Sequence, residues 1–288
     1  IDVCPVGALT SKPFRYRART WEMQSREAVA AHDSVGSNVY VHIAQRKAMR
    51  VVPRRNDDVN ETWISDRDRF SYEGMYSDDR LEAPQVKTSG SWAEVDWEDA
   101  IAATAEKLKS AVEKFGVDEV GVIASPNATT EELYLLQKVA RGLGLRNIDH
   151  RLREADFRDQ GQAPLHWSLG RPIAEFETLG AALVVGSNSR KEIPLVNHRL
   201  RKAAGAGAAV SFLNAVDYPA NFKVSPGAVV SPAGWVRELA ALVNAAGGGG
   251  DVPAQDWHKQ VAADLKDNES SAILLGALAA SHPQAAEL

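Results

Sequence analysis

The feature that most constrains the fold is an alternation of largely apolar strand-length runs with helical patterns. The segments 181–186, 208–213 and 271–276 are such runs, and helix-like stretches separate them. Strands that are apolar on both faces are typical of parallel sheets, because crossover helices cover both sides of such sheets. The alternation therefore predicts an α/β fold with a doubly wound, mainly parallel sheet.

Two helices upstream of these runs have clear start signals. Asp96 can cap a first helix that Gly116 would end, and Thr129 with Glu132 forms a capping box for a second. A strand over 117–124 is predicted between them. The apolar positions of the first helix recur at helical spacing, namely Ile101, Ala105, Leu108, Val112 and Phe115.

Later segments predict further helices, over 194–204, from Ser231-Pro232 onward, and from Ser281-His282-Pro283 onward. The N-terminal part is less regular. There, residues 36–56 alternate like a β-hairpin, which predicts a small β-rich region.

These patterns divide the chain into three expected parts. Residues 1–13 form an N-terminal segment, 14–91 the small β-rich region, and 92–288 the α/β domain. The chain begins Ile-Asp-Val-Cys and stops at Ala-Ala-Glu-Leu, so we expect it to be cut from a longer protein.

Composition excludes several classes of function. Lys plus Arg number 33 against 38 Asp plus Glu, a net charge of -5 that lacks the basic footprint of a nucleic-acid binder. The apolar runs fall short of the ~20 residues that span a bilayer. We therefore expect no nucleic-acid partner and no direct membrane insertion. The single cysteine, Cys4, excludes an internal disulfide and a thiolate metal cage built by this chain alone.

Three strand-to-helix loops, 125–129, 186–189 and 214–221, carry small polar residues where open α/β sheets bind ligands. Backbone N–H groups at such places suit phosphate. Neither the dinucleotide G-x-G-x-x-G nor the P-loop G-x-x-x-x-G-K-[ST] is present. Helix capping is therefore the favoured interpretation of the three loops, and nucleotide binding the alternative.

Cys4 is followed by Pro5. In bacterial iron–sulfur runs of the form C-x₂-C-x₂-C-x₃-C-P, the last cysteine ligand precedes a proline. A lone cysteine would otherwise be interpreted as a buried or free thiol.

The run IDVCPVGALTSKP at residues 1–13 resembles the 75 kDa-type iron–sulfur subunit of proton-translocating NADH:quinone oxidoreductase, respiratory complex I. The resemblance continues through 14–21, 32–38, 56–70 and 81–86. It implies an enzyme subunit that passes electrons from NADH-reduced flavin along iron–sulfur clusters to quinone. It also implies that Cys4 is the fourth ligand of a [4Fe–4S] cluster whose other cysteines lie upstream, so that residues 1–13 are the tail end of an upstream iron–sulfur domain.

The same resemblance implies partners and a location. The partners are the flavin- and NADH-binding subunit and the neighbouring iron–sulfur subunits of the peripheral arm, on the cytoplasmic side of the bacterial inner membrane. This chain would be mostly a non-catalytic scaffold. We expect it to bind no cluster and to oxidise no NADH by itself.

From about residue 14 onward the chain resembles the molybdopterin oxidoreductase fold, whose catalytic members place a C-x₂-C-x₃-C…C cluster motif near this point. We expect that cluster to be absent, because non-cysteine residues occupy the motif: Ser25, Ala28, His32 and Ser65. We further expect His32 to bond to protein groups, and three apolar side chains to fill the vacated space: Trp21, Val29 and Val35.

Gly186-Ser187-Asn188 and Pro194 resemble the loops that cradle the pterin pyrophosphate in molybdoenzymes. Such enzymes supply a Cys, selenocysteine or Ser to the metal from a segment resembling 150–167, and residues 149–167 contain none of these. Asp156 could substitute in principle. The resemblance thus implies no molybdopterin, with an active molybdopterin-dependent oxidoreductase as the alternative.

Overall fold

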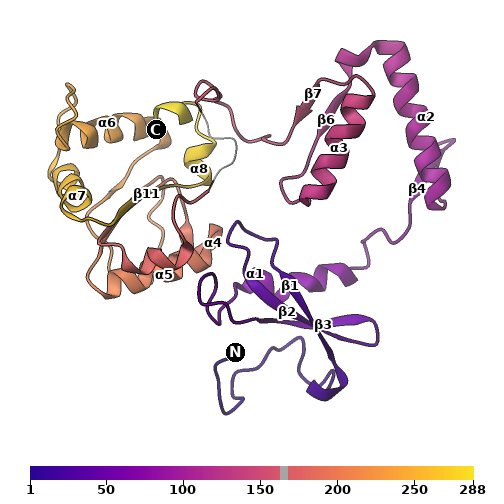
Figure 1. Cartoon of the computed structure of the whole chain (residues 1–288), viewed down its shortest axis with the longest axis horizontal. Coiled ribbons are helices and arrows are strands. Elements are labelled where there is room, and N and C mark those ends of the chain that lie inside the picture. Colours follow the sequence, from indigo (N-terminus) through magenta and orange to yellow (C-terminus); the bar gives the residue numbers. More distant parts are fainter. Residues whose placement is uncertain (163–167) are drawn as a thin grey trace. The chain divides into compact units, whose positions relative to one another are not determined.

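The computed structural model describes residues 1–162 and 168–288, which form two compact units (Figure 1). The first unit combines residues 1–72 with 153–288, and the second is 73–152. Our division into 1–13, 14–91 and 92–288 follows the sequence pattern and stays a prediction.

The first unit contains a four-stranded parallel sheet in the order β10-β9-β8-β11. Its strands are β8 (Ala181–Val185), β9 (Ala209–Asn214), β10 (Ala228–Val229) and β11 (Ser271–Leu275). The chain winds from β8 outward through β9 to β10, then crosses to the other side of β8 to form β11. The strand order reverses at β8, which confirms the predicted doubly wound sheet.

Helices cover both faces of this sheet. In Figure 1, α5 (Pro194–Gly205) lies on one side, and α6 (Trp235–Ala245) and α7 (Asp256–Asp267) lie on the other. Alternate strand residues point to opposite faces. Ala182 and Val184 pack with Leu200 of α5, whereas Leu183 and Val185 pack with residues of α6 and α7: Trp235, Leu242, Val261 and Ala262.

The C-terminal helix expected at 281–283 was wrong. A short helix, α8 (Ala277–Ala280), precedes this point, and Ser281 is its C-cap. A 3₁₀ turn, Ala285–Glu287, follows. His282 is buried against the ring of Trp235, with centroids 5.9 Å apart, and its Nδ1 accepts from Gln284 N at 3.0 Å. His282 therefore holds a turn, which no helical spacing could indicate.

The N-terminal part of the first unit is an antiparallel sheet in the order β1-β2-β3, formed by β1 (Gln24–Val29), β2 (Asn38–Ala44) and β3 (Lys47–Pro53). The predicted hairpin is β2–β3. Gln45 and Arg46 at its turn have φ of 51° and 62°, the two positive values of a type I′ turn. A 3₁₀ turn, Thr20–Glu22, precedes this sheet, and α1 (Asp66–Phe70) and a second 3₁₀ turn, Ser71–Tyr76, follow it.

The second unit begins with a hairpin, β4 (Gln85–Thr88) and β5 (Ser91–Glu94), and continues as α2 (Trp97–Phe115), β6 (Gly121–Ile123), α3 (Thr130–Gly142) and β7 (Asn147–Asp149). Strands β6 and β7 pair in parallel. Both predicted caps are confirmed. Asp96 Oδ1 accepts from Asp99 N at 2.8 Å, and Thr129 and Glu132 bond reciprocally. The strand expected at 117–124 is shorter, because Val117–Glu119 forms a 3₁₀ turn.

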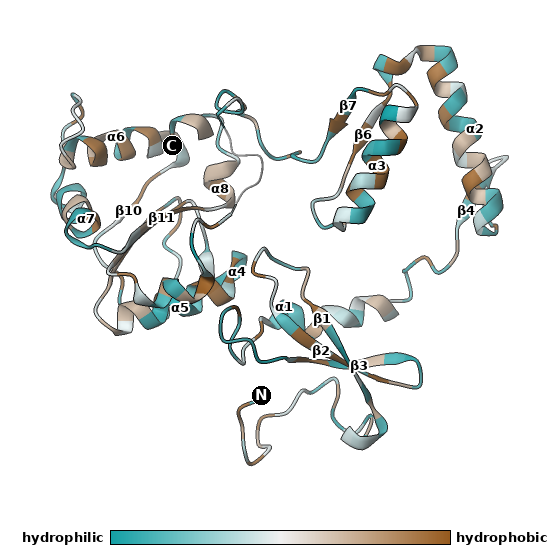
Figure 2. Cartoon of the chain, viewed as in Figure 1, coloured by the Kyte–Doolittle hydropathy of each residue, from teal (hydrophilic) through white to brown (hydrophobic). Residues whose placement is uncertain are grey.

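The apolar face predicted for α2 is present but open. Ile101 is 65% exposed and Phe115 61%, and none of the helix's residues is buried. Figure 2 shows apolar positions recurring along α2 and α3, and side chains of both helices line a groove of about 550 Å³. No helix in the described part of the chain has both the length and the apolar character needed to cross a membrane.

Candidate cluster ligand and sheet-edge site

Cys4 lies in a tight N-terminal turn. Its backbone N–H donates to Ile1 O at 3.2 Å, and Gly7, with φ of 64°, donates its N–H to Cys4 O at 3.3 Å. Hydrogen bonds from following backbone N–H groups, first Leu9 and then Ala8, Val6 and Gly7, lower the pKa of the partly exposed Cys4 thiol. The turn therefore favours a thiolate, which is the form that binds metal.

A groove of about 560 Å³ lies beside Cys4, and three arginines line it, Arg15, Arg50 and Arg69. Arg69 pairs with Asp2, its Nη1 donating to Oδ1 at 3.3 Å, and the Arg50 guanidinium lies 4.5 Å from the centroid of the Phe14 ring. Among the described residues, no group of three or more His, Cys, Asp or Glu side chains is arranged to hold a metal. Cys4 is the one cysteine of this sequence, and it lies at the edge of this groove.

The four positions of the expected lost cluster have separate roles. Ser25 and Ala28 lie in β1 and take part in its pairing with β2. Ser65 is buried and caps α1, its Oγ accepting from Asp68 N at 3.1 Å. His32 Nδ1 lies 2.9 Å from Asp68 Oδ1, so His32 bonds to a protein group, as expected.

Of the three apolar side chains that we expected to fill the vacated space, only Val35 is buried. Val35 is 6% exposed and joins the core beneath β8, whereas Trp21 is 82% exposed and Val29 63%. Trp21 belongs to a 3₁₀ turn without buried residues, and Val29 ends the outer strand β1. The expectation was wrong for Trp21 and Val29, because both stand on uncovered elements.

A second set with the same spacing, Ala30, Asp33 and Ser37, escaped the sequence analysis. The Asp33 side chain is 3% exposed; its Oδ1 accepts from Val35 N at 3.0 Å, and its Oδ2 pairs with Arg67 of α1 at 3.4 Å. Burial raises the pKa of Asp33, and nearby Asp68 raises it further. Asp33, and not Ser25 or Ala28, lies against the helix that Ser65 caps.

Two of the predicted loops meet at the carboxyl edge of the parallel sheet. Asn214, at the end of β9, accepts from Ser187 N at 2.9 Å and donates to Ser187 O at 3.0 Å, and both residues are buried. Gly186 has φ of 63°, and a Cβ there would lie 2.7 Å from Ala279 N, so this position requires glycine. The third loop, 125–129, belongs to the second unit and caps α3.

A carboxylate lies between the ends of β8 and β11. Glu192, the last residue of α4 (Ser189–Glu192), accepts hydrogen bonds from Ser187 Oγ at 2.9 Å, Asn188 N at 3.2 Å and Ala277 N at 3.1 Å. The first two donors follow β8, and the third follows β11. A cavity of about 450 Å³ lies beside these groups. The chain thereby places a negative charge at its own strand ends.

Asp156, the alternative metal ligand, is already bonded within the chain. Arg158 donates to its carboxylate from Nε at 2.9 Å and from Nη2 at 2.8 Å, and Ala286 N donates at 3.0 Å. Hydrogen bonds from Arg158, and then from Ala286, hold the pKa of Asp156 far below its usual range. Residues 163–167 of the expected metal-ligand segment lie outside the described residues.

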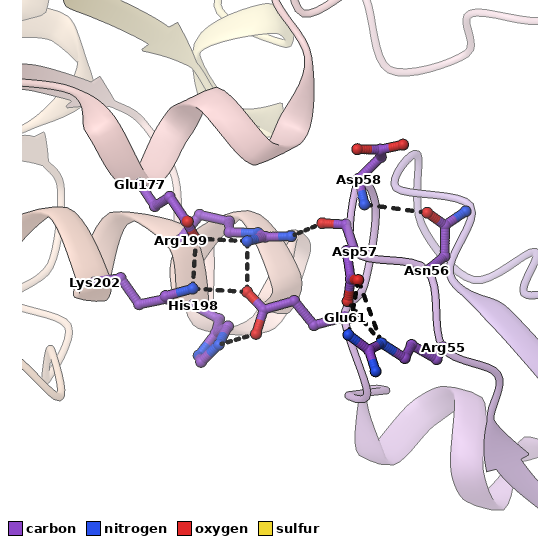
Figure 3. Close-up of polar contacts among 9 residues, drawn as sticks. All are labelled: Arg55, Asn56, Asp57, Asp58, Glu61, Glu177, His198, Arg199 and Lys202. Carbon is purple, nitrogen blue, oxygen red and sulfur yellow. Dashed lines mark hydrogen bonds and ion pairs between the residues drawn. The ribbon is translucent and has the colours of Figure 1, made fainter.

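An ionic network within the first unit also escaped the sequence analysis (Figure 3). The Arg199 side chain, 4% exposed, pairs with Glu61 and Glu177 and donates from Nη2 to Asp57 O at 2.6 Å. Lys202, one turn further along α5, pairs with the same two carboxylates. The network ties α5 to the loop after β3. The sequence signal for this network was the i, i+3 spacing of Arg199 and Lys202, which places both cations on one face of the helix.

The charges of this network lower both carboxylate pKa values. Hydrogen bonds from Lys202 and Arg199 lower the pKa of Glu177. Burial alone would raise the pKa of Glu61, but the Lys202 hydrogen bond and the Arg199 charge outweigh it, so this pKa is lowered too. Burial lowers the pKa of the neighbouring His198. Since the acids and bases pair with one another, the arrangement suits stability.

Two protein-family models match the chain. The model described as molybdopterin oxidoreductase matches residues 80–287. The model described as the 4Fe-4S domain of NADH-ubiquinone oxidoreductase NDSU1/NuoG-like proteins matches residues 23–73.

Similar proteins carry related names. An NADH-quinone oxidoreductase subunit of Rickettsia felis is 32% identical over 72% of this chain and 30% of its own length. The NADH-ubiquinone oxidoreductase 75 kDa subunit of Reclinomonas americana is 36% identical over 70% of this chain and 30% of its own length. The chain thus matches about 30% of the length of these relatives, and their names confirm the resemblance read from the sequence.

A solved structure supports the same fold. Acetylene hydratase from Pelobacter acetylenicus superimposes with a TM-score of 0.62 over 90% of this chain and 42% of that one, at 13% identity. At such low sequence identity, this similarity is evidence for the fold alone. The molybdopterin oxidoreductase model matches residues 80–287, which is well over half of this chain. The chain therefore belongs to the molybdopterin oxidoreductase family.

Proposed function

We propose that the chain is part of the iron–sulfur subunit of an NADH:quinone oxidoreductase, which passes electrons from NADH and flavin through iron–sulfur clusters to quinone. The observation that carries this proposal is Cys4, a thiol with a lowered pKa in a Cys-Pro turn. The match of residues 23–73 to a 4Fe-4S domain of this enzyme supports it.

Cys4 would bind one iron of a [4Fe–4S] cluster, with the remaining thiolates supplied from outside this chain. When bound, the cluster supplies one-electron transfer. The backbone N–H groups of Val6 to Leu9 donate toward Sγ and stabilise negative charge there. Arg15, Arg50 and Arg69 line the same groove against one carboxylate, Asp2, and this excess of positive charge would raise the reduction potential of the cluster.

The α/β body would serve as a scaffold for neighbouring peripheral-arm subunits, the flavin- and NADH-binding subunit among them, at the cytoplasmic face of the membrane. The relatives are named as subunits of NADH-quinone or NADH-ubiquinone oxidoreductase, which supports a place among other subunits. The scaffold role is supported by the charged groups of this body, which bond to one another in the Arg199 network and at Asp156.

The test is Cys4→Ser in the complete subunit within the assembled complex, read by EPR of the reduced clusters. We expect one cluster's signal to be lost or strongly weakened while the others persist. Ser25→Ala is the matched control, since it alters a position of the lost motif without touching Cys4. An unchanged spectrum in the Cys4→Ser complex would remove Cys4 from the ligand set.

The chain by itself should hold little iron, because a [4Fe–4S] cluster normally takes four thiolates and this sequence has one cysteine. Iron and acid-labile sulfide measured after anaerobic reconstitution should stay far below one cluster per chain. Turnover of NADH with ferricyanide should be absent as well. Iron at about four per chain would contradict the assignment of the other ligands to a different segment.

A further inference from the structure

In doubly wound sheets, ligands bind outside the carboxyl ends of the strands, where the strand order reverses. In this chain the reversal falls between β8 and β11. An anionic group placed there would be held by the backbone N–H groups and small hydroxyls that follow the two strands. The bonding of those donors therefore decides whether the site can take a phosphate.

The donors at this point are bonded to the chain itself. Ser187 Oγ, Asn188 N and Ala277 N all donate to the carboxylate of Glu192, at 2.9, 3.2 and 3.1 Å. Ser187 N donates to Asn214 Oδ1 at 2.9 Å. These are the kinds of group that would hold the pyrophosphate of a pterin cofactor, so the residues present do not fit that group.

Glu192 is also fixed by its backbone. Its N–H donates to Asn188 O at 2.9 Å, and its carbonyl accepts from Arg67 Nη2 at 2.9 Å. The strand ends meet closely, because a Cβ at Gly276 would lie 2.3 Å from Ser187 Cβ. The carboxylate therefore belongs to a packed arrangement that spans both strands.

We propose that Glu192 is a built-in anion that closes the phosphate-binding position of this fold. A pyrophosphate approaching these donors would meet the carboxylate in the same place and with the same sign of charge. Glu192 thereby excludes pyrophosphate-bearing cofactors, molybdopterin included, and links the ends of β8 and β11 instead. This inference does not depend on the proposed role in electron transfer.

The test is isothermal titration calorimetry of the whole chain with inorganic pyrophosphate and, separately, with GDP, which carries a pyrophosphate group. Wild-type protein should show no saturable binding at millimolar ligand. Glu192→Ala removes the carboxylate and frees its three donors, so we expect saturable binding at least about tenfold tighter than wild type, weakened again by adding Ser187→Ala. Glu132→Ala is the matched control, because Glu132 also accepts a backbone N–H, from Thr129 at 2.7 Å, but spans no second strand.

Two results would overturn the proposal: saturable binding of pyrophosphate by the wild-type chain, or a folded Glu192→Ala protein that binds no better than wild type. Should Glu192→Ala fail to fold, hydrogen exchange of the wild-type chain and of Glu192→Gln decides. The Asn188 and Ala277 amides should exchange slowly in wild type and faster in Glu192→Gln. Exchange of both wild-type amides at the rate of open loops would contradict the carboxylate bridge.

Discussion

The first unit's parallel sheet and the second unit are built from the same kinds of element but bury them to very different degrees. Each of the five residues of β8 is 2% exposed or less. In β6 of the second unit, Ile123 is 65% exposed, and the buried hydrophobic residues described in that unit are Ala124, Ala140 and Leu145. Four paired strands with helices on both faces exclude water, whereas two paired strands leave their faces open.

The difference teaches that a helix with apolar periodicity and an N-cap can form whether or not its apolar face is covered. Helix α2 has its Asp96 cap and no buried residue. A parallel sheet reaches full stability only when both faces are covered. We therefore expect the first unit to depend on core packing and ion pairing, and the second to depend more on local terms such as capping.

The largest expected effect comes from removing a core ring. Trp235 is 0% exposed, so Trp235→Ala should lower the free energy of unfolding by about 4 kcal/mol. Trp97 in α2 is 72% exposed, and Trp97→Ala should change it by less than about 0.5 kcal/mol. Urea unfolding monitored by far-UV circular dichroism measures both. Similar losses for the two tryptophans would break the comparison.

Breaking the Arg199 network should have the next largest effect. Arg199→Met removes the buried cation and leaves Glu61 and Glu177 paired with Lys202, so we expect a loss of about 2 kcal/mol, as for lost hydrogen bonds to charged groups. Arg55→Met is the matched control, since Arg55 is exposed and its ion pair is with the exposed side chain of Asp57. The urea midpoint should fall in the first variant and stay unchanged in the second.

Acidification should weaken the first unit through the same network. Because the pKa values of Glu61 and Glu177 are lowered on folding, their contribution is complete above the unfolded Glu pKa of ~4.3 and is lost as pH falls through the folded values. The urea midpoint should therefore drop more steeply between about pH 6 and pH 3 in wild type than in the double variant Glu61→Gln/Glu177→Gln. Parallel pH profiles would contradict this assignment.

The smallest effect tests the second unit. Thr129→Ala removes the cap of α3 and should cost about 1 kcal/mol, seen as faster hydrogen exchange in peptides covering α3. Thr129→Ser keeps the hydroxyl and should exchange as wild type does. If the alanine variant exchanges no faster, local capping is not what holds α3 in place.

Sequence pattern was sufficient for elements that carry their own signals. The Asp96 and Thr129 caps, the apolar run of β8 and the alternation of β2 and β3 all predicted what the structure contains. The position of the β2–β3 turn could be predicted, but its type I′ conformation could not. Gln45-Arg46 is not the Asn-Gly pair that usually marks two positive φ values. Strand β10, two residues long, gave no periodic signal at all.

The sites were harder to predict, because they depend on contacts between distant segments. Spacing alone could not choose between two possible registers of the expected cluster motif, and only the burial of its side chain distinguishes Asp33, beside α1. Nothing in the sequence distinguishes Glu192 from other helix residues, because its hydrogen bond from Ala277 joins positions far apart in the chain. Cys4 was found because its signal, a cysteine followed by proline, is local.

The outer edge of β11 has a consequence for how this chain behaves by itself. In the sheet as described, β11 pairs with β8, and Ile273 and Leu275 are 59% and 53% exposed. Arg171 donates to the carbonyl of Ser271, at the start of the strand. An apolar strand edge of this kind is a template for pairing with another chain. Newly made protein is therefore open to strand-to-strand aggregation at β11, and a lysine in place of Ile273 would act as a gatekeeper against it.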